Sequence, residues 1–284
     1  MLLISLTGGI GTVKSTAANL LRQRGAHVLV LDDVARTVLD PGTPATWEVG
    51  QLWPTVVRDG IVDRAGLAQI VFNDPEALAQ LNAITHPRTW QAAERILERW
   101  NAEDSHGVAI IEIAILADSV RRFASHLNVV VGADTDVRME RLAGRGLARE
   151  DARTRMDNQR PQVELAGLAD VWLDNSGSPS ELASQICELW ENRLVPYAQN
   201  LAAGERRCGT AREPAPADVQ RCLERLSYHG ISAKRSERAG ELVALWPDSG
   251  GLAPSCTAAL AAAGFVPGEG CYELADPEYY LSLQ

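Results

Sequence analysis

A glycine-rich turn directly after the first apolar run is the feature that most constrains how this chain folds. Residues 2–6 are apolar apart from one serine, and the sequence GGIGTVKST follows at residues 8–16. A loop of the form G-x-x-x-x-G-K-[ST] wraps phosphate groups with backbone N–H donors, meets their charge with its lysine and offers a hydroxyl to magnesium. Gly8, Lys14 and Ser15 match this form. The sequence therefore predicts a buried strand, a phosphate-binding loop and a helix, in that order.

The whole stretch is our candidate nucleotide site, with contacts from Gly8, Gly9, Ile10, Gly11, Thr12, Val13, Lys14, Ser15 and Thr16. Val13 occupies the position of the last glycine of the pattern. A branched side chain there crowds the phosphate and disfavours backbone angles that glycine adopts at little cost. A penalty of about 2 to 3 kcal/mol would shift a micromolar site toward millimolar affinity. Val13 is therefore the main argument against a working loop.

Two other interpretations of the loop are possible. A dinucleotide-binding turn has the form G-x-G-x-x-G, and Lys14 replaces its third glycine, so we reject that interpretation. A glycine-rich turn without any ligand is the plainer alternative. Against it, Lys14 is one of only two lysines, with Lys234, among 27 basic residues. A lysine at this position of an arginine-rich chain favours the phosphate site.

Composition limits the class of protein and its partners. The 284 residues are 46% hydrophobic and carry a net charge of −10, so we expect a folded chain that binds neither nucleic acid nor membranes. Five cysteines show no C-x-x-C spacing, which predicts reduced thiols without disulfide or metal roles. No apolar segment approaches the roughly 20 residues of a membrane helix. The chain is predicted to be soluble and cytoplasmic, and self-association is left open.

Short apolar runs alternate with helical patterns, which is typical of an α/β fold with a parallel sheet. We expect strands at residues 2–6, 27–31, 108–113, 127–131 and 170–173, and a helix at 14–24. Asp74, Pro75 and Glu76 form a helix start signal. Residues 85–87, Thr-His-Pro, are expected to break that helix before another runs to about Trp100.

The composition changes near Pro196. Residues 199–216 are polar and rich in helix breakers, which is typical of a linker. Residues 217–284 show one helical pattern, at 219–226, followed by pieces interrupted by glycine and proline. So short a segment has a marginal core by itself. We expect a first domain at 1–198, and a tail that can be removed near Ala203 without unfolding that domain.

Several stretches together resemble the dephospho-CoA kinase family. Besides the loop and Asp32, they are DRAGLAQIVFNDPEALAQLNAITHP (63–87), VRMERLAGRG (137–146), the run ARTRMDNQ ending at Gln159, and ADVWLDNSGSPSEL (169–182). The resemblance covers about residues 1–198. It implies a P-loop kinase with a parallel five-stranded sheet flanked by helices, a helical lid and a substrate subdomain. LVPYAQNLA (194–202) and LAAAGFVPGEG (260–270) resemble parts of actinobacterial members with a GrpB-like domain, which implies a truncated GrpB-like remnant at 217–284.

The resemblance implies ATP-dependent phosphorylation of the ribose 3′-hydroxyl of dephospho-CoA, the last step of coenzyme A synthesis. ATP and Mg²⁺ are the implied cofactors, and dephospho-CoA and ATP the binding partners. Phosphoryl transfer mainly needs alignment and charge neutralisation. By this resemblance Lys14 contacts the β- and γ-phosphates, Ser15 is a ligand of magnesium, and Glu112 holds the water shell of the ion. Asp32, after the second strand, is the candidate base and substrate contact, with a solvated helix cap as its plain alternative.

The segment 138–160 holds seven arginines and four acids, a net charge of +3. Most of these arginines are expected on a solvated helix face. Arg141 and Arg145 match the family's lid pattern, so we expect Arg141 to bind substrate and act in catalysis and Arg145 to bind ATP phosphates. We expect His86 to fix the turn before Pro87 or to touch substrate.

The chain also departs from the family pattern outside the loop. Val30 replaces the first acid of a D-x-D motif, and Ala114, Ile115, Leu116 and Asp118 replace a Pro-Leu-Leu stretch followed by Glu. Three hypotheses therefore stay open. The chain is a dephospho-CoA kinase, an impaired homologue kept as a scaffold or regulatory partner, or a kinase for another nucleoside or small hydroxyl substrate.

Overall fold

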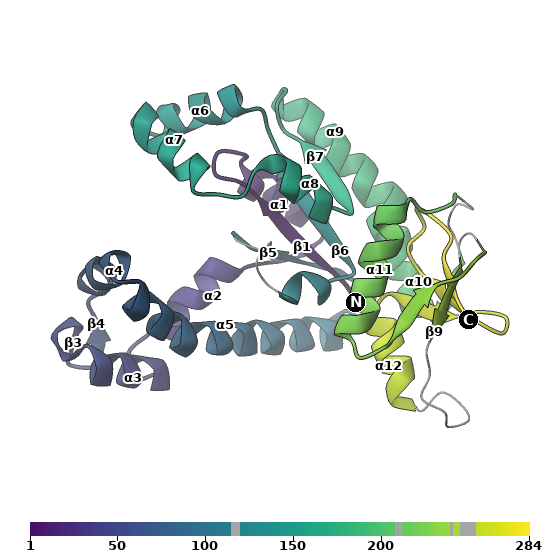
Figure 1. The fold of residues 1–284 in the computed structure, drawn as a ribbon, viewed down its shortest axis with the longest axis horizontal. Helices are drawn as coiled ribbons and strands as arrows, with labels where there is room; N and C mark the ends of the chain where they lie inside the picture. The colour runs from purple at the N-terminus through teal and green to yellow at the C-terminus, as the bar shows by residue number, and fades with distance from the viewer. Residues whose placement is uncertain (115–119, 208, 210–211, 239–240, 245–253) are drawn as a thin grey trace. The chain divides into compact units, whose positions relative to one another are not determined.

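The structure is a computed structural model that describes residues 1–284 except 115–119, 208, 210–211, 239–240 and 245–253 (Figure 1). Its contacts divide the chain into two compact units. The first combines Met1–Val28 with Glu103–Gln284, and the second is Leu29–Ala102. Each unit has a hydrophobic core made from its own elements.

A five-stranded sheet carries the glycine-rich loop. Its strand order is β2-β5-β1-β6-β7, and the neighbours of β1 and β6 pair in parallel. The predicted α/β fold is thereby confirmed, and the expected strands and first helix lie within two residues of their observed bounds. The strands are β1 (Leu2–Gly8), β2 (His27–Val30), β5 (Val108–Glu112), β6 (Leu127–Gly132) and β7 (Val171–Asp174).

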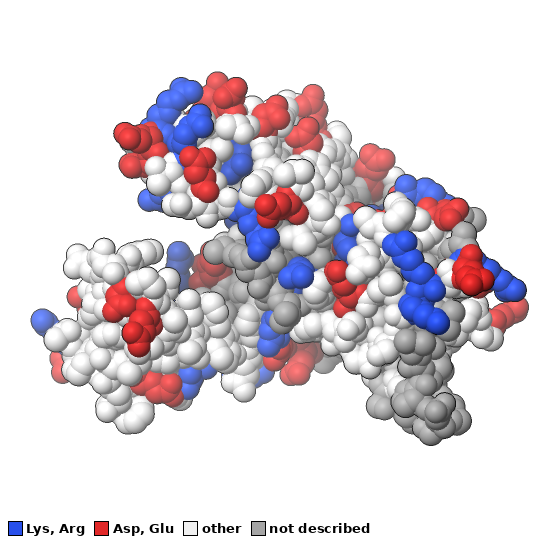
Figure 2. Space-filling model, in the orientation of Figure 1, with Lys and Arg blue, Asp and Glu red and all other residues white. Residues whose placement is uncertain are grey.

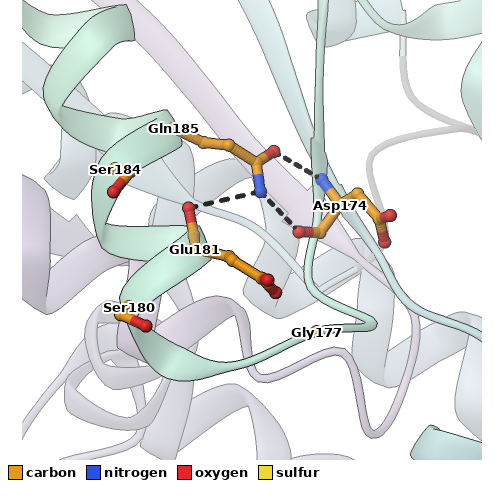
Figure 3. Close-up of a pocket in the computed structure, with 6 residues that line it drawn as sticks. All are labelled: Asp174, Gly177, Ser180, Glu181, Ser184 and Gln185. Atoms are coloured by element: carbon orange, nitrogen blue, oxygen red, sulfur yellow. Dashed lines mark hydrogen bonds between the residues drawn. The ribbon is translucent and has the colours of Figure 1, made fainter.

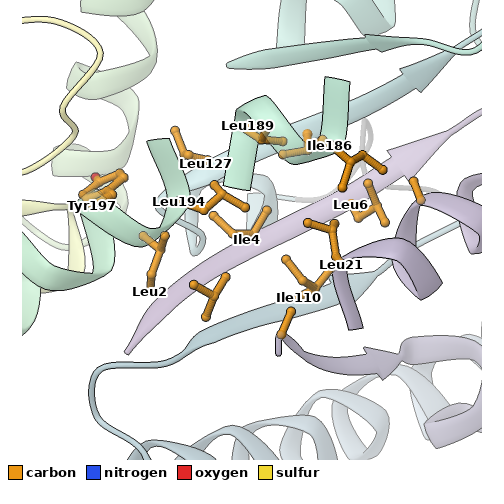
Figure 4. Close-up of a cluster of buried hydrophobic side chains, with 14 of the residues drawn as sticks. Leu2, Ile4, Leu6, Leu21, Ile110, Leu127, Ile186, Leu189, Leu194 and Tyr197 are labelled. Atoms are coloured by element: carbon orange, nitrogen blue, oxygen red, sulfur yellow. The ribbon is translucent and has the colours of Figure 1, made fainter. Parts of the chain in front are cut away.

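Helices cover one face of this sheet with apolar side chains. Leu2, Ile4 and Leu6 of β1 alternate inward and pack against Leu21 and Ile186, all without solvent exposure (Figure 4). The first unit contains α1 (Lys14–Gln23), η2 (Val120–Phe123), α6 (Thr135–Gly144), α7 (Arg149–Asp157), α8 (Gln162–Leu168), α9 (Pro179–Leu189), the π-helical turn η3 (Trp190–Leu194) and α10 (Val195–Ala203). This packing fixes the end of β1 and the start of α1, between which the loop lies.

The C-terminal part of the first unit contains a second five-stranded sheet, of order β10-β11-β12-β9-β8. The expected helix at 219–226 lies inside α11, whereas the strands were not anticipated. Leu226, Phe265 and Tyr279 are buried in the core of this part. Its elements are α11 (Pro216–Tyr228), β8 (Ala233–Arg235), β9 (Glu241–Ala244), α12 (Pro254–Ala262), β10 (Phe265–Pro267), β11 (Tyr272–Leu274) and β12 (Ser282–Leu283).

The second unit is mainly helical and packs around Val49, Leu67 and Val71. Asp63 caps α4 by accepting hydrogen bonds from two backbone N–H groups, and Thr43 caps α3. Its elements are α2 (Leu31–Val38), α3 (Pro44–Leu52), η1 (Pro54–Val56), β3 (Val57–Arg58), β4 (Ile61–Val62), α4 (Arg64–Asn73) and α5 (Pro75–Glu103).

The expected break at residues 85–87 is wrong, because α5 continues through Pro87. The predicted start is correct, since Asp74 accepts hydrogen bonds from the N–H groups of the second and third residues of the helix. Side-chain donors next to the proline bind nearby carbonyls: Thr85 to Leu81, Arg88 to Ile84, and Thr89 to Thr85. These bonds and the burial of Ile84 and Thr89 offset the hydrogen bond that proline cannot make.

Among the helices that the structure describes, none combines the length and apolar character needed to cross a membrane.

Candidate active site

The glycine-rich loop joins the end of β1 to the start of α1, as the sequence predicts. At two positions of the loop, neighbouring backbone atoms leave no room for a side chain, so glycine is required. A side chain at Gly8 would overlap the carbonyl oxygen of Val131, and at Gly11, where φ is 79°, it would meet the backbone of Arg138. The loop is therefore packed tightly between β6 and α6.

Val13 adopts a left-handed conformation, with φ 61° and ψ 47°, which glycine reaches at little cost. For a β-branched residue this conformation is an outlier that costs on the order of 1–3 kcal/mol. The loop therefore keeps its glycine-like shape around the valine. That a triphosphate fits against the isopropyl group of Val13 stays a prediction.

The loop keeps several backbone donors unused. Thr12 donates its N–H and its hydroxyl to the carbonyl of Gly9, and Thr16 donates to Val13. Within the described part of the chain, the N–H groups of Gly11, Val13, Lys14 and Ser15 are among the loop donors that have no acceptor. They lie at the positive end of the α1 dipole, so this end of the helix suits an anion.

Lys14 adds a full positive charge beside these donors. Its side chain is half-buried, and no carboxylate of the described residues forms an ion pair with it. Ser15 and Thr16 are exposed in the first turn of α1. Lysine, hydroxyl and free amides are therefore brought together as the sequence predicts.

The lid arginines differ in their surroundings, although Figure 2 shows basic and acidic side chains intermixed over α6 and α7. Arg141 is half-buried, and its buried Nη1 has no hydrogen-bond partner among the described residues. An anion would satisfy this donor. Arg145 is exposed at the C-terminal end of α6 and shows no such feature. The structure thus distinguishes two residues that the sequence treats alike.

Arg138 is a cation at the loop to which the sequence interpretation gave no role. Its side chain is only 6% exposed, its Nε donates to the Ile10 carbonyl at 2.8 Å, and no described carboxylate pairs with it. Burial lowers the pKa of its guanidinium. Helical periodicity could have revealed it, because Arg138 lies four residues before the buried Leu142.

Two further polar side chains that the sequence interpretation missed bind the loop. Gln159 accepts a hydrogen bond from the Ile10 N–H at 2.8 Å. Asn175 donates to the Thr12 carbonyl at 2.8 Å and is 5% exposed. Both lie within stretches that carry the family resemblance, but no local pattern indicates that they contact residues more than 140 positions away.

The proposed magnesium ligands lie at the same edge of the sheet. Glu112 ends β5 and pairs in register with Leu6 of β1, two residues before the loop, while Ser15 opens α1. The described residues contain no cluster of three or more His, Cys, Asp and Glu side chains suited to a metal. One hydroxyl and one carboxylate fit Mg²⁺, which usually takes most of its ligands from phosphates and water.

Asp32 and His86 belong to the second unit. Asp32 is exposed in the first turn of α2, directly after β2, which ends at Val30. His86 is exposed on α5, so the expectation that it fixes a turn is wrong, because the helix is continuous there. Ile115, Leu116 and Asp118 lie outside the described residues.

A cavity of about 440 Å³ lies between the end of β7 and α9 (Figure 3). Gln185 bridges these elements by accepting from the Asp174 N–H and donating to the Asp174 carbonyl. Asp174 and Glu181 line the cavity, and none of its lining residues is a lysine or arginine. Two carboxylates disfavour phosphate, so the loop rather than this cavity is the candidate nucleotide site.

The chain matches the family model of dephospho-CoA kinase over residues 2–181. A protein named dephospho-CoA kinase from Mycobacterium bovis is 38% identical over 262 residues, which cover 87% of this chain and 63% of that relative. The relative of the same name from Mycolicibacterium paratuberculosis is 36% identical, covering 84% and 60%. The chain thus spans about 60% of the length of these relatives.

A shorter relative, named dephospho-CoA kinase, from Thermobifida fusca is 37% identical over 67% of this chain and 96% of its own length. The crystal structure of TT1252 from Thermus thermophilus has a TM-score of 0.59 and 33% identity, covering 66% of this chain and 96% of that one. The loop, the parallel sheet and these matches agree: the chain belongs to the dephospho-CoA kinase family.

Proposed function

We propose that this chain transfers the γ-phosphoryl group of ATP to the ribose 3′-hydroxyl of dephospho-CoA, the last step of coenzyme A synthesis. One observation carries the proposal. Within the described part of the chain, loop N–H groups without acceptors and a half-buried lysine without an ion pair lie together in sequence at a helix N-terminus, in a member of the dephospho-CoA kinase family. Such a set of donors suits a polyphosphate and no neutral ligand.

Each charged group has a separate task in this reaction. Lys14 neutralises the β- and γ-phosphates, and the unpartnered Nη1 of Arg141 binds the phosphoryl group in transfer. Arg145 reaches the phosphates from the end of α6. Asp32 accepts the proton of the attacking hydroxyl, and His86 contacts dephospho-CoA. The second-unit roles are supported by sequence position alone.

Magnesium belongs to the proposal as well. When bound, it would neutralise the charge that develops on the transferred phosphoryl group. Ser15 would offer its hydroxyl as a ligand, and Glu112 would help to hold the ion through its water shell. A cytoplasmic location, the assignment of residues 217–284 as a GrpB-like remnant and self-association stay predictions.

Calorimetric titration of ATP with Mg²⁺ into the full chain, followed by mass spectrometry of dephospho-CoA incubated with both, tests the proposal. We expect micromolar affinity and a product heavier by one phosphate. If the chain is an impaired homologue, the wild type should give no heat of ATP binding and the Val13→Gly variant should give one. A wild-type chain that binds ATP and phosphorylates other small hydroxyl compounds in preference to dephospho-CoA would instead favour a different substrate.

A further inference from the structure

We propose that Arg138, Gln159 and Asn175, here called the loop brace, hold residues 9–13 in the phosphate-binding shape and so allow a valine at position 13. The inference rests on the proposed ATP binding of the loop. It assigns positioning roles to three side chains that lie outside the sequence pattern of the loop itself.

Asn175 controls the peptide unit that precedes the valine. Its Nδ2 donates to the Thr12 carbonyl at 2.8 Å, and that carbonyl belongs to the peptide unit whose other end is the Val13 nitrogen. Rotation of this unit changes ψ of Thr12 and φ of Val13 together. Asn175 is 5% exposed, and its backbone N–H donates to the Gly132 carbonyl at 2.8 Å. The residue is therefore held in place both by its backbone and by its side-chain amide. The bond therefore resists the return of Val13 to negative φ.

Arg138 and Gln159 hold the two peptide units on either side of Ile10. Gln159 accepts from the Ile10 N–H, and Arg138 Nε donates to the Ile10 carbonyl, each at 2.8 Å. The contact is close, since a Cβ on Gly9 would lie 2.8 Å from Arg138 Nη2 and 3.2 Å from Gln159 Oε1. Neither peptide unit can rotate without breaking a buried or half-buried hydrogen bond.

The brace comes from three separate elements. Arg138 lies in α6, Gln159 follows α7, and Asn175 follows β7. The backbone of Gln159 is tied to Met156 through its own N–H. The brace is thus set by the tertiary fold, which exists before any nucleotide arrives.

This arrangement predicts energetic coupling between the brace and the valine. In the wild type, the strained φ of Val13 pulls the loop away from its phosphate-binding shape, and the brace opposes it. When one bond of the brace is removed, part of the free energy of ATP binding is used to bring the loop into its phosphate-binding shape, so the measured affinity for ATP falls. With glycine at position 13 the backbone strain is absent. Removing the same bond should therefore change the affinity for ATP much less.

The experiment is a double-mutant cycle on ATP affinity. Calorimetry measures the dissociation constant of ATP with Mg²⁺ for wild type, Asn175→Ala, Val13→Gly and the double variant, all as full chains. We expect Asn175→Ala to weaken binding about tenfold or more in the wild type, and less than about threefold beside Val13→Gly. In steady-state assays, Asn175→Ala should raise KM for ATP and leave KM for dephospho-CoA within about twofold.

Gln162→Ala is the matched control. The side-chain amide of Gln162 also makes hydrogen bonds to backbone groups: it accepts from the Ala133 N–H at 3.0 Å and donates to the Ala133 carbonyl at 2.8 Å. These bonds do not involve the loop. We expect its ATP affinity to stay at the wild-type value in both backgrounds. Gln159→Ala, at a half-buried position, repeats the cycle should Asn175→Ala melt below the assay temperature.

Equal loss of ATP affinity in the two backgrounds, or no loss in either, would overturn the brace. A wild-type chain that binds ATP but leaves dephospho-CoA unphosphorylated would contradict the proposed function, while the coupling expected for the brace would still be measured on ATP alone. The two proposals therefore fail through different readouts.

Discussion

At the scale of single residues, the loop is unusual at Val13, whose backbone lies in the left-handed region with φ 61° and ψ 47°. The N–H groups of Gly11, Lys14 and Ser15 have no protein acceptor within the described part of the chain. The sequence predicts the place of the loop between strand and helix correctly, while the roles of its lysine and hydroxyl stay predictions. It cannot predict the conformation of Val13, because local preference favours negative φ and only contacts from distant segments decide otherwise.

Lys14 should be required for turnover. Lys14→Ala removes the charge that we propose to meet the transferred phosphoryl group, so we expect kcat to fall at least about a hundredfold. Lys234→Ala is the control, because Lys234 is the chain's other lysine and lies exposed in β8. A coupled assay of ADP formation measures both variants. Full activity of Lys14→Ala would exclude our assignment of the loop.

Asp32 should act on rate rather than on nucleotide affinity. Asp32→Asn removes the carboxylate that we propose as proton acceptor, and we expect kcat to fall by about 10²–10⁴ with ATP affinity nearly unchanged. Its neighbour Asp33 provides the control, since it pairs with Arg36 on the surface at 3.1 Å. Rate constants and calorimetric affinities for both variants decide the matter. Similar rates for Asp32→Asn and Asp33→Asn would contradict a base at position 32.

At the scale of helices and strands, periodicity predicted the parallel sheet because buried strands leave continuous apolar runs. It failed at Pro87, where hydrogen bonds from Thr85 and Arg88 and burial of Ile84 override a local breaker. It also missed the C-terminal sheet, whose strands have two to four residues, among them β9 (Glu241–Ala244) and β12 (Ser282–Leu283). Such short strands depend on partners distant in sequence, so their own pattern is weak.

The joint between β1 and α12 contains a buried histidine. His126 Nδ1 accepts from the Leu3 N–H at 2.9 Å, and its Nε2 lies 3.3 Å from the Ala261 carbonyl. This pairing requires a neutral ring that carries its proton on Nε2. Burial, opposed by the hydrogen bond to the Ala261 carbonyl and assisted by the nearby charge of Arg225, lowers the pKa of His126 from 6.5 to about 4.

The stability of the chain should therefore decrease in mild acid. The unfolded chain binds a proton near pH 6.5 and the folded chain only near pH 4, so stability is complete above pH 6.5 and is lost as the pH falls toward 4. We expect the free energy of unfolding to drop by about 2 kcal/mol between pH 7.5 and pH 5 from this group. Urea denaturation at both values measures it. His126→Gln should reduce the drop, whereas the exposed His106→Gln should not; equal drops in the two variants would contradict a neutral buried His126.

At the scale of the first unit, buried ion pairs tie the C-terminal part to the parallel sheet. Arg193 binds Asp276 through two hydrogen bonds of 3.0 and 2.7 Å, with the pair at most 10% exposed. Asp170, next to β7, pairs with Arg221 and Arg225 of α11. Burial alone would raise the pKa of Asp170, but these two arginines outweigh it and hold the pKa below its usual value.

These contacts oppose the expectation that the tail can be removed near Ala203. A chain ending there would lose the ion-pair partners of Arg193 and Asp170, and it would also remove Val266 and Ala275 from the core cluster that contains Tyr197, which is destabilising. We therefore expect residues 1–203 alone to lose cooperative thermal unfolding, as measured by circular dichroism or calorimetry. A sharp transition near that of the full chain would show that residues 1–203 fold without the remainder.

A single substitution tests the same connection without truncation. We expect Asp276→Ala to reduce the free energy of unfolding by about 3–5 kcal/mol, because it leaves a buried guanidinium uncompensated. Glu278→Ala is the matched control, since its pair with Arg212 is exposed and should contribute less than about 1 kcal/mol. Urea denaturation of both full-length variants gives the difference, and similar values would contradict a structural role for the buried pair.

The central claim is that the loop receives a triphosphate through its unused backbone donors, despite the valine. Amide-resolved NMR of the full chain during titration with ATP and Mg²⁺ tests it most directly. We expect the resonances of Gly11, Val13, Lys14 and Ser15 to shift together with one micromolar dissociation constant, and the Ile10 amide, already bound to Gln159, to shift less. Unchanged loop resonances at millimolar ATP would contradict the claim.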